Sequence, residues 1–257
     1  MGILKKSILI CGVLSTLLAV EARAAWRLNT LTGIANYQFE GAGPGGNIWE
    51  SKPTYCEEPY MFIELSQRPR AAEVWNSKKS VFFHRAFFEY LGGSWERDQV
   101  QLLHKKIETF LFGTGAGWAL ARGLSFEVGP LAFLQRSRLR DLASTDGATI
   151  DFGRLGSYFS FSSRAVMGRW EGEVVNTIGL LGFPQRQSAV EELKVSIERY
   201  LSDGRWSVGL AGQIGLFQVG QHGNRTERVG AVSDAVTRFR QGETDFSIIM
   251  LKLGYRL

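Results

Sequence analysis

The clearest pattern in the chain is an alternation of apolar with small or polar residues between Trp206 and Asn224, a stretch without charged side chains. Length alone would allow a membrane-spanning helix here. The four glycines between Gly209 and Gly220, however, would each cost a helix about 1 kcal/mol relative to alanine. The apolar residues recur at every second position, which is the period of a β-strand: Trp206, Val208, Leu210, Ile214 and Leu216. The pattern therefore predicts a strand with one apolar face and one small, polar face.

The segment before this strand alternates in the same way, and a tight turn separates the two. Residues 190–201 alternate Leu, Val and Ile with charged and polar neighbours, and the Asp203-Gly204 pair follows them. Asp-Gly between two alternating runs is a strong hairpin signal. Two further hairpins are predicted on similar grounds, with turns near Arg122-Gly123 and near Ser163-Arg164. Repeated hairpins predict an antiparallel sheet of consecutive strands.

Extended along the chain, this pattern predicts an all-β protein of about ten strands, with a range of roughly 8 to 12. The expected strands cover residues 27–39, 56–66, 80–91, 107–120, 124–135, 149–162, 166–179, 190–201, 205–219 and 244–257. Short connections follow the fourth, sixth and eighth strands, whereas most of the other connections are about ten residues or longer. The link around Arg68 to Lys79 is too long for a tight turn, and we expect a short helix or an irregular strand there.

The first residues have the form of a secretory signal peptide. Two lysines precede an apolar run over Ile8–Val20, and Ala22-Arg23-Ala24 supplies the small residues that a signal peptidase reads. The apolar run is shorter than the roughly 20 residues that a spanning helix needs. We therefore expect residues 1–24 to be removed on export and residues 25–257 to form one domain.

Removal of this segment changes two further properties of the chain. Cys56 becomes the only cysteine, so an intramolecular disulfide is excluded. The net charge of +5 falls to +3, because Lys5, Lys6 and Arg23 with Glu21 together contribute +2. This small excess is spread along the chain and does not indicate a nucleic-acid partner.

Amphipathic strands of about ten residues, short turns alternating with long loops, an export signal and an apolar last strand together resemble the bacterial outer-membrane β-barrel proteins. The resemblance implies a closed, antiparallel, up-and-down transmembrane β-barrel in the outer membrane of a double-membraned bacterium. It also implies contact with outer-membrane lipid and with the barrel-assembly machinery. In that family the machinery reads alternate residues at the chain end, here Tyr255 and Leu257, and Leu257 replaces the usual phenylalanine.

A transmembrane barrel turns its apolar faces to lipid, so the opposite faces should line the lumen. The charged residues expected there are Glu58, Glu64, Arg85, Glu89, Glu127, Arg169, Glu171, Glu173, Lys194, Glu198, Lys252 and Arg256. The aromatic residues expected in interfacial belts are Trp26, Trp95, Trp170, Trp206 and Tyr255. A soluble, secreted, lipocalin-like ligand-binding barrel with its apolar faces inward is the alternative that the pattern leaves open.

No motif in the chain indicates catalysis, a cofactor or a metal. His84 has outward parity in its strand, and His104 and His222 belong to expected loops, so the three histidines are isolated from one another. A metal site would need two or more ligands on one face. The GTGAGW stretch at 113–118 lacks the third glycine and the following helix of a nucleotide-binding loop. An outer-membrane lipid hydrolase with a Ser/His pair at the outer rim remains an alternative.

The sequence thus predicts an integral outer-membrane barrel that is structural, or a narrow channel for ions and very small solutes, without enzymatic activity. A lumen of about ten strands crowded with charged pairs would pass little else. Arginines in the longest loop, from Gln221 to Gln241, fit a lipopolysaccharide contact. Nothing in the pattern indicates an oligomeric state.

Overall fold

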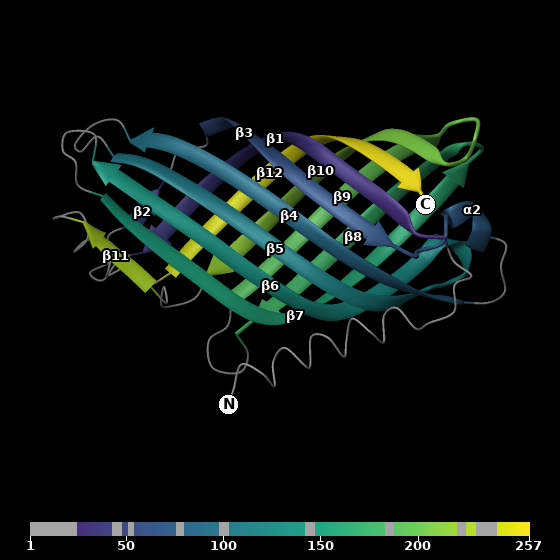
Figure 1. Ribbon diagram of the computed structural model, residues 1–257, viewed down its shortest axis with the longest axis horizontal. Coiled ribbons are helices and arrows are strands. Elements are labelled where there is room, and N and C mark those ends of the chain that lie inside the picture. The colour runs from purple at the N-terminus through teal and green to yellow at the C-terminus, as the bar shows by residue number, and fades with distance from the viewer. Residues whose placement is uncertain are drawn as a thin grey trace.

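The computed structural model describes residues 25–42, 48–50, 54–75, 80–97, 103–141, 147–182, 188–219, 225–229 and 241–257. The predicted signal peptide lies outside these ranges. Strands make up nearly all of the described chain (Figure 1). They are β1 (Arg27–Ala42), β2 (Ile48–Glu50), β3 (Thr54–Ser66), β4 (Val81–Arg97), β5 (Leu103–Ala119), β6 (Leu124–Asp141), β7 (Gly147–Met167), β8 (Trp170–Leu181), β9 (Ser188–Tyr200), β10 (Trp206–Val219), β11 (Arg225–Val229) and β12 (Gln241–Arg256). Two short helical segments accompany them, α2 (Ala71–Val74) and η1 (Ala121–Gly123).

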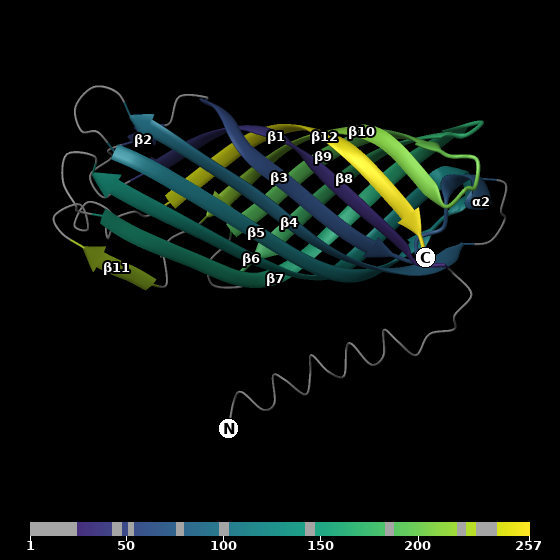
Figure 2. The same ribbon diagram turned by 45° about the horizontal axis from the view of Figure 1, so that its top comes forward.

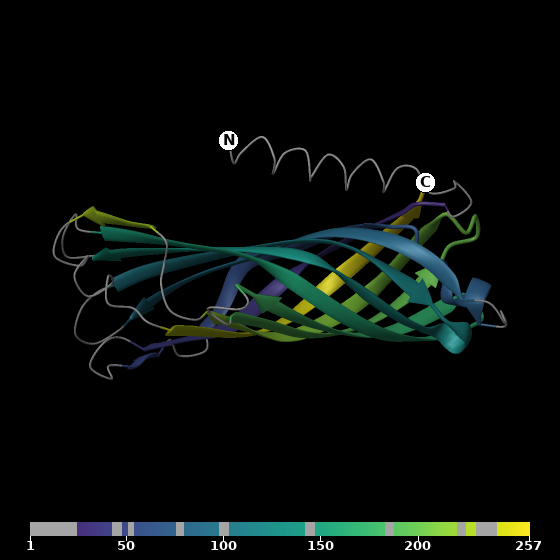
Figure 3. The same ribbon diagram turned by 90° about the horizontal axis from the view of Figure 1, so that it is seen from below.

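Ten of the strands close into a ring in which consecutive strands pair antiparallel. The order around the ring is β1, β3, β4, β5, β6, β7, β8, β9, β10 and β12, and β12 returns to pair with β1. The short strands β2 and β11 extend β1 and β7 outside the ring. Figures 2 and 3 show the resulting tube of diagonal strands. This is the closed up-and-down barrel that the sequence predicts, with all ten expected strands present.

The two ends of the barrel differ. At the turn end, residues 120–123, 168–169 and 201–205 make the short connections, and α2 and the carboxyl-terminal residue lie beside them (Figure 2). At the opposite end, here called the loop end, β1, β4, β6, β8 and β10 end. Glycine closes the turns, since Gly123, Gly168 and Gly204 have φ of 77°, 62° and 68°. Glycine adopts this left-handed region without steric cost.

One hairpin turn lies elsewhere than predicted. We expected a turn near Ser163-Arg164, but β7 continues to Met167 and the chain turns at Gly168-Arg169. Alternation runs through the expected turn undisturbed, because Ser163 is exposed outside and Arg164 is buried inside. The polar residues suggested an interruption, whereas the residue that permits the turn is Gly168.

The link between β3 and β4 contains a short helix, which is one of the two predicted outcomes. Val74 of α2 packs against Phe83 and Ala119 at the turn end. Ala71 of the same helix is also buried. Among the described helices, none is long and apolar enough to cross a membrane. The packing of Val74 and Ala71 places α2 over the turn end of the barrel (Figure 1).

The outer surface of the barrel is apolar. Along β10, Trp206, Leu210 and Ile214 are 47%, 55% and 56% exposed, whereas Ala211 and Gln213 point inward and are buried. Soluble monomers rarely expose so continuous an apolar surface. In the hydrocarbon of a membrane, an apolar outer surface is the favoured kind. A lipocalin-like barrel would need these same residues inside, so that alternative is wrong.

Aromatic side chains gather on the outer surface at the turn end. Trp170 and Trp206 begin their strands, and Trp26 precedes β1. The ring of Trp206 lies 4.5 Å from that of Tyr255. Rings at the end of an apolar band are typical of a membrane interface. The side chain of Trp95 lies outside the described ones, so its place in a belt stays a prediction.

A charge on the apolar surface should prevent stable insertion. We expect Leu210→Arg to cost about 2 to 4 kcal/mol, because the side chain lies within the apolar band, whereas Leu201→Arg at the turn end should cost about 0 to 1 kcal/mol. The measurement is the fraction of each variant in the outer-membrane pellet that migrates as a compact form without heating. Equal tolerance of the two substitutions would show that this surface does not face hydrocarbon.

Candidate functional site

Every second residue of each ring strand points into the barrel, where long side chains from opposite walls meet. In β4, Arg85, Phe87 and Glu89 are buried inside, whereas Phe82 is exposed on the outer wall. Glycines on the neighbouring strand β5 make room for these larger side chains, since any side chain at Gly113 would collide with the Phe87 ring. The GTGAGW stretch thus thins one face of β5.

Arg85 is the centre of a buried ion-pair network in the turn-end half of the barrel. Its Nε donates to the Glu64 carboxylate at 2.9 Å, and its Nη1 donates to Glu127 at 3.3 Å. The Tyr158 hydroxyl donates to the other oxygen of Glu127. Removing one partner of such a pair leaves a buried, uncompensated charge, which costs about 3 to 5 kcal/mol. Through Glu64, Arg85, Glu127 and Tyr158, the network connects β3, β4, β6 and β7 across the interior.

A second network lies across the interior around Glu198. Lys252 donates to Glu198 at 3.1 Å and lies 4.0 Å from the Glu173 carboxylate. Arg27 forms an ion pair with the other Glu198 oxygen, and the Ser207 hydroxyl donates to that oxygen at 2.7 Å. Glu198 thus joins the first and last strands of the ring to β9 and β10.

The link between β3 and β4 contributes a residue that the sequence reasoning missed. Arg68 extends into the barrel, where it donates to Glu173 at 2.6 Å and to the hydroxyls of Ser125 and Ser162. Its partners come from β6, β7 and β8, far from it in sequence. Arg68 belongs to a segment without strand periodicity, so no sequence signal distinguishes it from an ordinary loop arginine.

Further contacts fasten the same link across the turn-end mouth. Nη1 of Arg164 donates to the Pro69 carbonyl at 2.7 Å, and the Ala71 amide donates to Glu171 at 3.1 Å. The link is thus held by the interior of the barrel as well as by the packing of α2.

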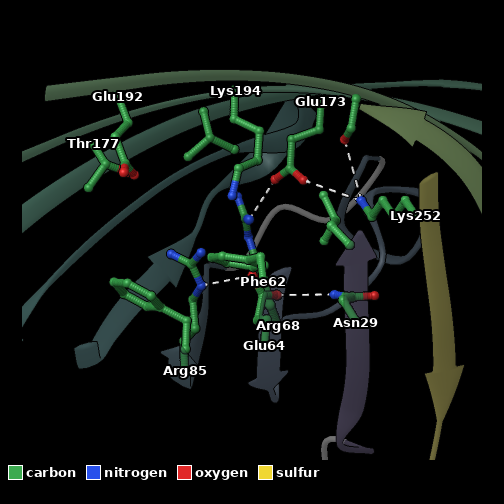
Figure 4. A pocket seen from close by; sticks show the side chains of 14 residues that line it. Asn29, Phe62, Glu64, Arg68, Arg85, Glu173, Thr177, Glu192, Lys194 and Lys252 are labelled. Carbon is green, nitrogen blue, oxygen red and sulfur yellow. Dashed lines mark hydrogen bonds and ion pairs between the residues drawn. The ribbon is translucent and has the colours of Figure 1, made fainter. Parts of the chain in front are cut away.

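A cavity of about 40 Å³ remains between the two networks (Figure 4). On one side of it Arg68 and Lys252 reach Glu173, and on the other Arg85 and Asn29 reach Glu64 (Figure 4). One water needs about 10 to 15 Å³ of such volume, so the cavity holds only a few. It has the size of a hydrated gap in a packed interior, and is too small for a solute.

Two carboxyl groups lie together one layer further toward the loop end. The Tyr60 hydroxyl and the Gln213 amide both donate to the same oxygen of Glu89, Oε1, each at 2.9 Å. Glu192 lies within side-chain hydrogen-bonding reach of Glu89. Nevertheless, Glu89 Oε2 and Glu192 Oε1 receive no hydrogen bond from any described residue. Two buried carboxyl groups this close cannot both be ionised without strong repulsion, so the pair is a local weakness of the interior.

Toward the loop end, most of the described inward side chains are apolar, which corrects the expectation of a charged lumen throughout. The Phe217 ring is fully buried between Phe133 and Phe246, with ring centroids 5.6 and 4.7 Å apart. The layer that we call the apolar plug comprises these rings and further buried residues from the surrounding strands, namely Leu91, Leu111, Leu131, Leu181, Val190, Ile248 and Met250. The sequence pattern did not predict this, because alternation shows which residues share a face of a strand. It does not show that the inward face changes from charged to apolar along the strand.

Most of the charged residues expected in the lumen lie in the interior. They are Glu64, Arg85, Glu89, Glu127, Glu171, Glu173, Lys194, Glu198 and Lys252. Arg256 lies at the turn-end rim, where it donates to Glu73 at 2.9 Å with its side chain 40% exposed. Arg169 is a correction, because it belongs to the β7–β8 turn and is exposed. The side chain of Glu58 lies outside the described ones.

The histidines do not form a catalytic or metal-binding group in the described part of the chain. His84 lies on the outer wall near the turn end, with the Phe82 ring at 4.9 Å, and its ring nitrogens have no hydrogen-bond partner among the described residues. His104 lies within β5 and not in a loop as expected, but its side chain, like all of His222, lies outside the described residues. No three described His, Cys, Asp or Glu side chains are grouped to hold a metal ion.

A ring of ten antiparallel strands with an apolar exterior and charged groups inside is the architecture of the transmembrane β-barrels of bacterial outer membranes. Solved structures of such barrels are similar to the chain in fold. The translocator domain of autotransporter NalP from Neisseria meningitidis has a TM-score of 0.44 and 8% identity, over 98% of this chain and 97% of that one. Outer membrane protease OmpT from Escherichia coli has a TM-score of 0.42 and 9% identity, over 92% and 98%. The P. putida toluene transporter TodX has a TM-score of 0.36 and 6% identity, over 92% and 91%.

No family model matches the chain, and no curated protein matches it in sequence.

The carboxyl pair gives a test of the interior. Glu192→Gln should stabilise the folded barrel by about 1 to 3 kcal/mol at pH 8, because an amide can donate to the unsatisfied oxygen of Glu89 and carries no charge. The measurement is the temperature at which the compact form is lost on gels. Glu191→Gln, which changes an exposed neighbour on the same strand, should leave this temperature unchanged. A lower temperature for Glu192→Gln would show that the carboxylate of Glu192 is needed where it lies.

Proposed function

We propose that the protein is an integral outer-membrane barrel with a structural role, and that its interior is closed to solutes. The observation that carries the proposal is that the described side chains fill much of the interior. The apolar plug around Phe217 lies across it on the loop-end side, and Arg68 and α2 of the link lie over the turn-end mouth. A solute would have to displace both.

A narrow ion channel, the other form of the predicted function, needs a continuous polar path. The two charged networks offer polar surface from the turn end as far as Glu89. Beyond that layer, an ion would have to lose its water among the rings of the apolar plug, and hydrophobic constrictions of this kind block conduction by dewetting. The filled interior therefore favours the structural role over the channel.

The proposal includes export and assembly in the outer membrane of a double-membraned bacterium. Residues 1–24 would serve as the signal peptide, and Tyr255 and Leu257 would be read by the barrel-assembly machinery. Leu257 is 66% exposed on the outer wall, so its side chain is accessible to a partner. Lipid of the outer membrane, including lipopolysaccharide, would cover the apolar surface.

The proposal also excludes enzymatic activity. A lipid hydrolase of the kind considered above would need a serine and a histidine together at the loop end. His84 lies near the opposite end, and the side chains of His104 and His222 lie outside the described ones.

Conductance in planar bilayers tests the proposal directly. We expect the refolded protein to insert without producing discrete conductance steps at 1 M salt. The double variant Phe133→Ala and Phe217→Ala should conduct, because it removes two rings of the apolar plug. Phe112→Ala, which removes a ring from the outer wall, serves as the matched control and should remain silent. Regular steps from the unmodified protein would overturn the closed barrel and establish the narrow channel.

A further inference from the structure

A cavity of about 220 Å³ lies at the turn end, between the link and the barrel mouth. Its wall contains an unusual number of guanidinium groups with a single described carboxylate, Glu73. The arginines that border it are Arg27, Arg68, Arg70, Arg205 and Arg256. They come from β1, β12, the β3–β4 link and the β9–β10 turn, so only the folded barrel brings them together.

Three of these arginines are neutralised by a carboxylate. Arg27 is paired with Glu198, Arg68 with Glu173, and Arg256 with Glu73. Arg70 and Arg205 have no ion-pair partner among the described residues. The cavity therefore carries two positive charges that the described part of the protein does not balance.

Arg70 is held in place without an acid. Its guanidinium lies over the Tyr200 ring, 3.6 Å from the centroid, which orients it through a cation–π contact. Its Nε is buried and has no hydrogen-bond partner among the described residues. On the other side, a Cβ at Gly204 would lie 3.8 Å from Nη1 of Arg70, so the β9–β10 turn that carries Arg205 lies beside it. An oriented donor that lacks an acceptor is the expected form of an anion-binding group in the absence of the anion.

We propose that this cavity binds a phosphate group, with Arg70 and Arg205 as its principal ligands. The planar guanidinium fork matches a phosphate with two parallel hydrogen bonds, and phosphate can accept from two arginines at once. Ala25 also borders the cavity. If the predicted signal peptide is removed before Ala25, the new α-ammonium group adds a third uncompensated positive charge.

Two sources of the phosphate share this chemistry. The aromatic side chains of Trp206 and Tyr255 lie on the outer wall beside Arg205, at the height where lipid headgroups are expected. A lipid phosphate is therefore close by. A soluble phosphorylated molecule would reach the same arginines through the turn-end mouth.

The test is calorimetric titration of inorganic pyrophosphate into the refolded, mature barrel in a zwitterionic detergent at low salt. We expect saturable binding that weakens as salt rises. Arg205→Gln and Arg70→Gln should each weaken it about tenfold, and the double variant about a hundredfold, because each removes a charge-assisted contact. Arg205 is exposed and makes no described side-chain contact, so its replacement keeps the test valid even if Arg70→Gln disturbs the link.

Arg169→Gln is the matched control, since it removes an exposed arginine from a neighbouring turn that does not border the cavity. It should leave pyrophosphate binding unchanged. Absence of binding, or equal binding by all variants, would overturn the proposal. Repeating the titration in nanodiscs identifies the source: loss of pyrophosphate binding in phosphatidylglycerol but not in phosphatidylcholine indicates a lipid phosphate, and equal binding in both indicates a soluble one.

Discussion

The structure depends on one requirement, that every backbone amide and carbonyl within hydrocarbon find a partner in the protein. A sheet meets it only by closing, and here β12 pairs with β1 over the whole length of both strands. The Leu257 amide extends this pairing, since it donates to the Trp26 carbonyl at 2.8 Å. The apolar last strand is therefore an interior member of a ring. Its outward side chains contact lipid, and its inward ones join the networks.

Closure also decides where charge can lie. An outer wall in lipid excludes charged side chains, so they collect inside, where each must find a partner. Lys252 and Arg27 form ion pairs with Glu198, and Arg85 forms ion pairs with Glu64 and Glu127. Toward the loop end, the described inward side chains are mainly the aromatic and aliphatic residues around Phe217. In the described interior, ion pairs thus predominate toward the turn end and apolar packing predominates around Phe217, and the Glu89–Glu192 pair lies between the two.

Much of the fold could be predicted because alternation is a local property. The strand from Trp206, its apolar face and the Asp203-Gly204 turn all follow from neighbouring residues. What could not be predicted depends on distances across the ring. Arg68 finds its partners on strands about 60 to 100 residues away, and Phe217 meets Phe133 only because opposite walls approach. Arg169 falls on the alternate positions that point inward in β8, but it lies one residue before that strand begins. Outside a strand, alternation no longer decides where a side chain points.

The seam between β1 and β12 also sets an order of events. It joins the first and last described strands, so its register brings together residues almost a whole chain apart. Closing so long a loop costs conformational entropy that local contacts do not repay, whereas the other ring strands can add hairpin by hairpin. Until the seam forms, β1 and β12 are open edges, and an open edge is a template for pairing with another chain. Whatever holds these two strands apart from other chains therefore governs both the speed and the fidelity of maturation.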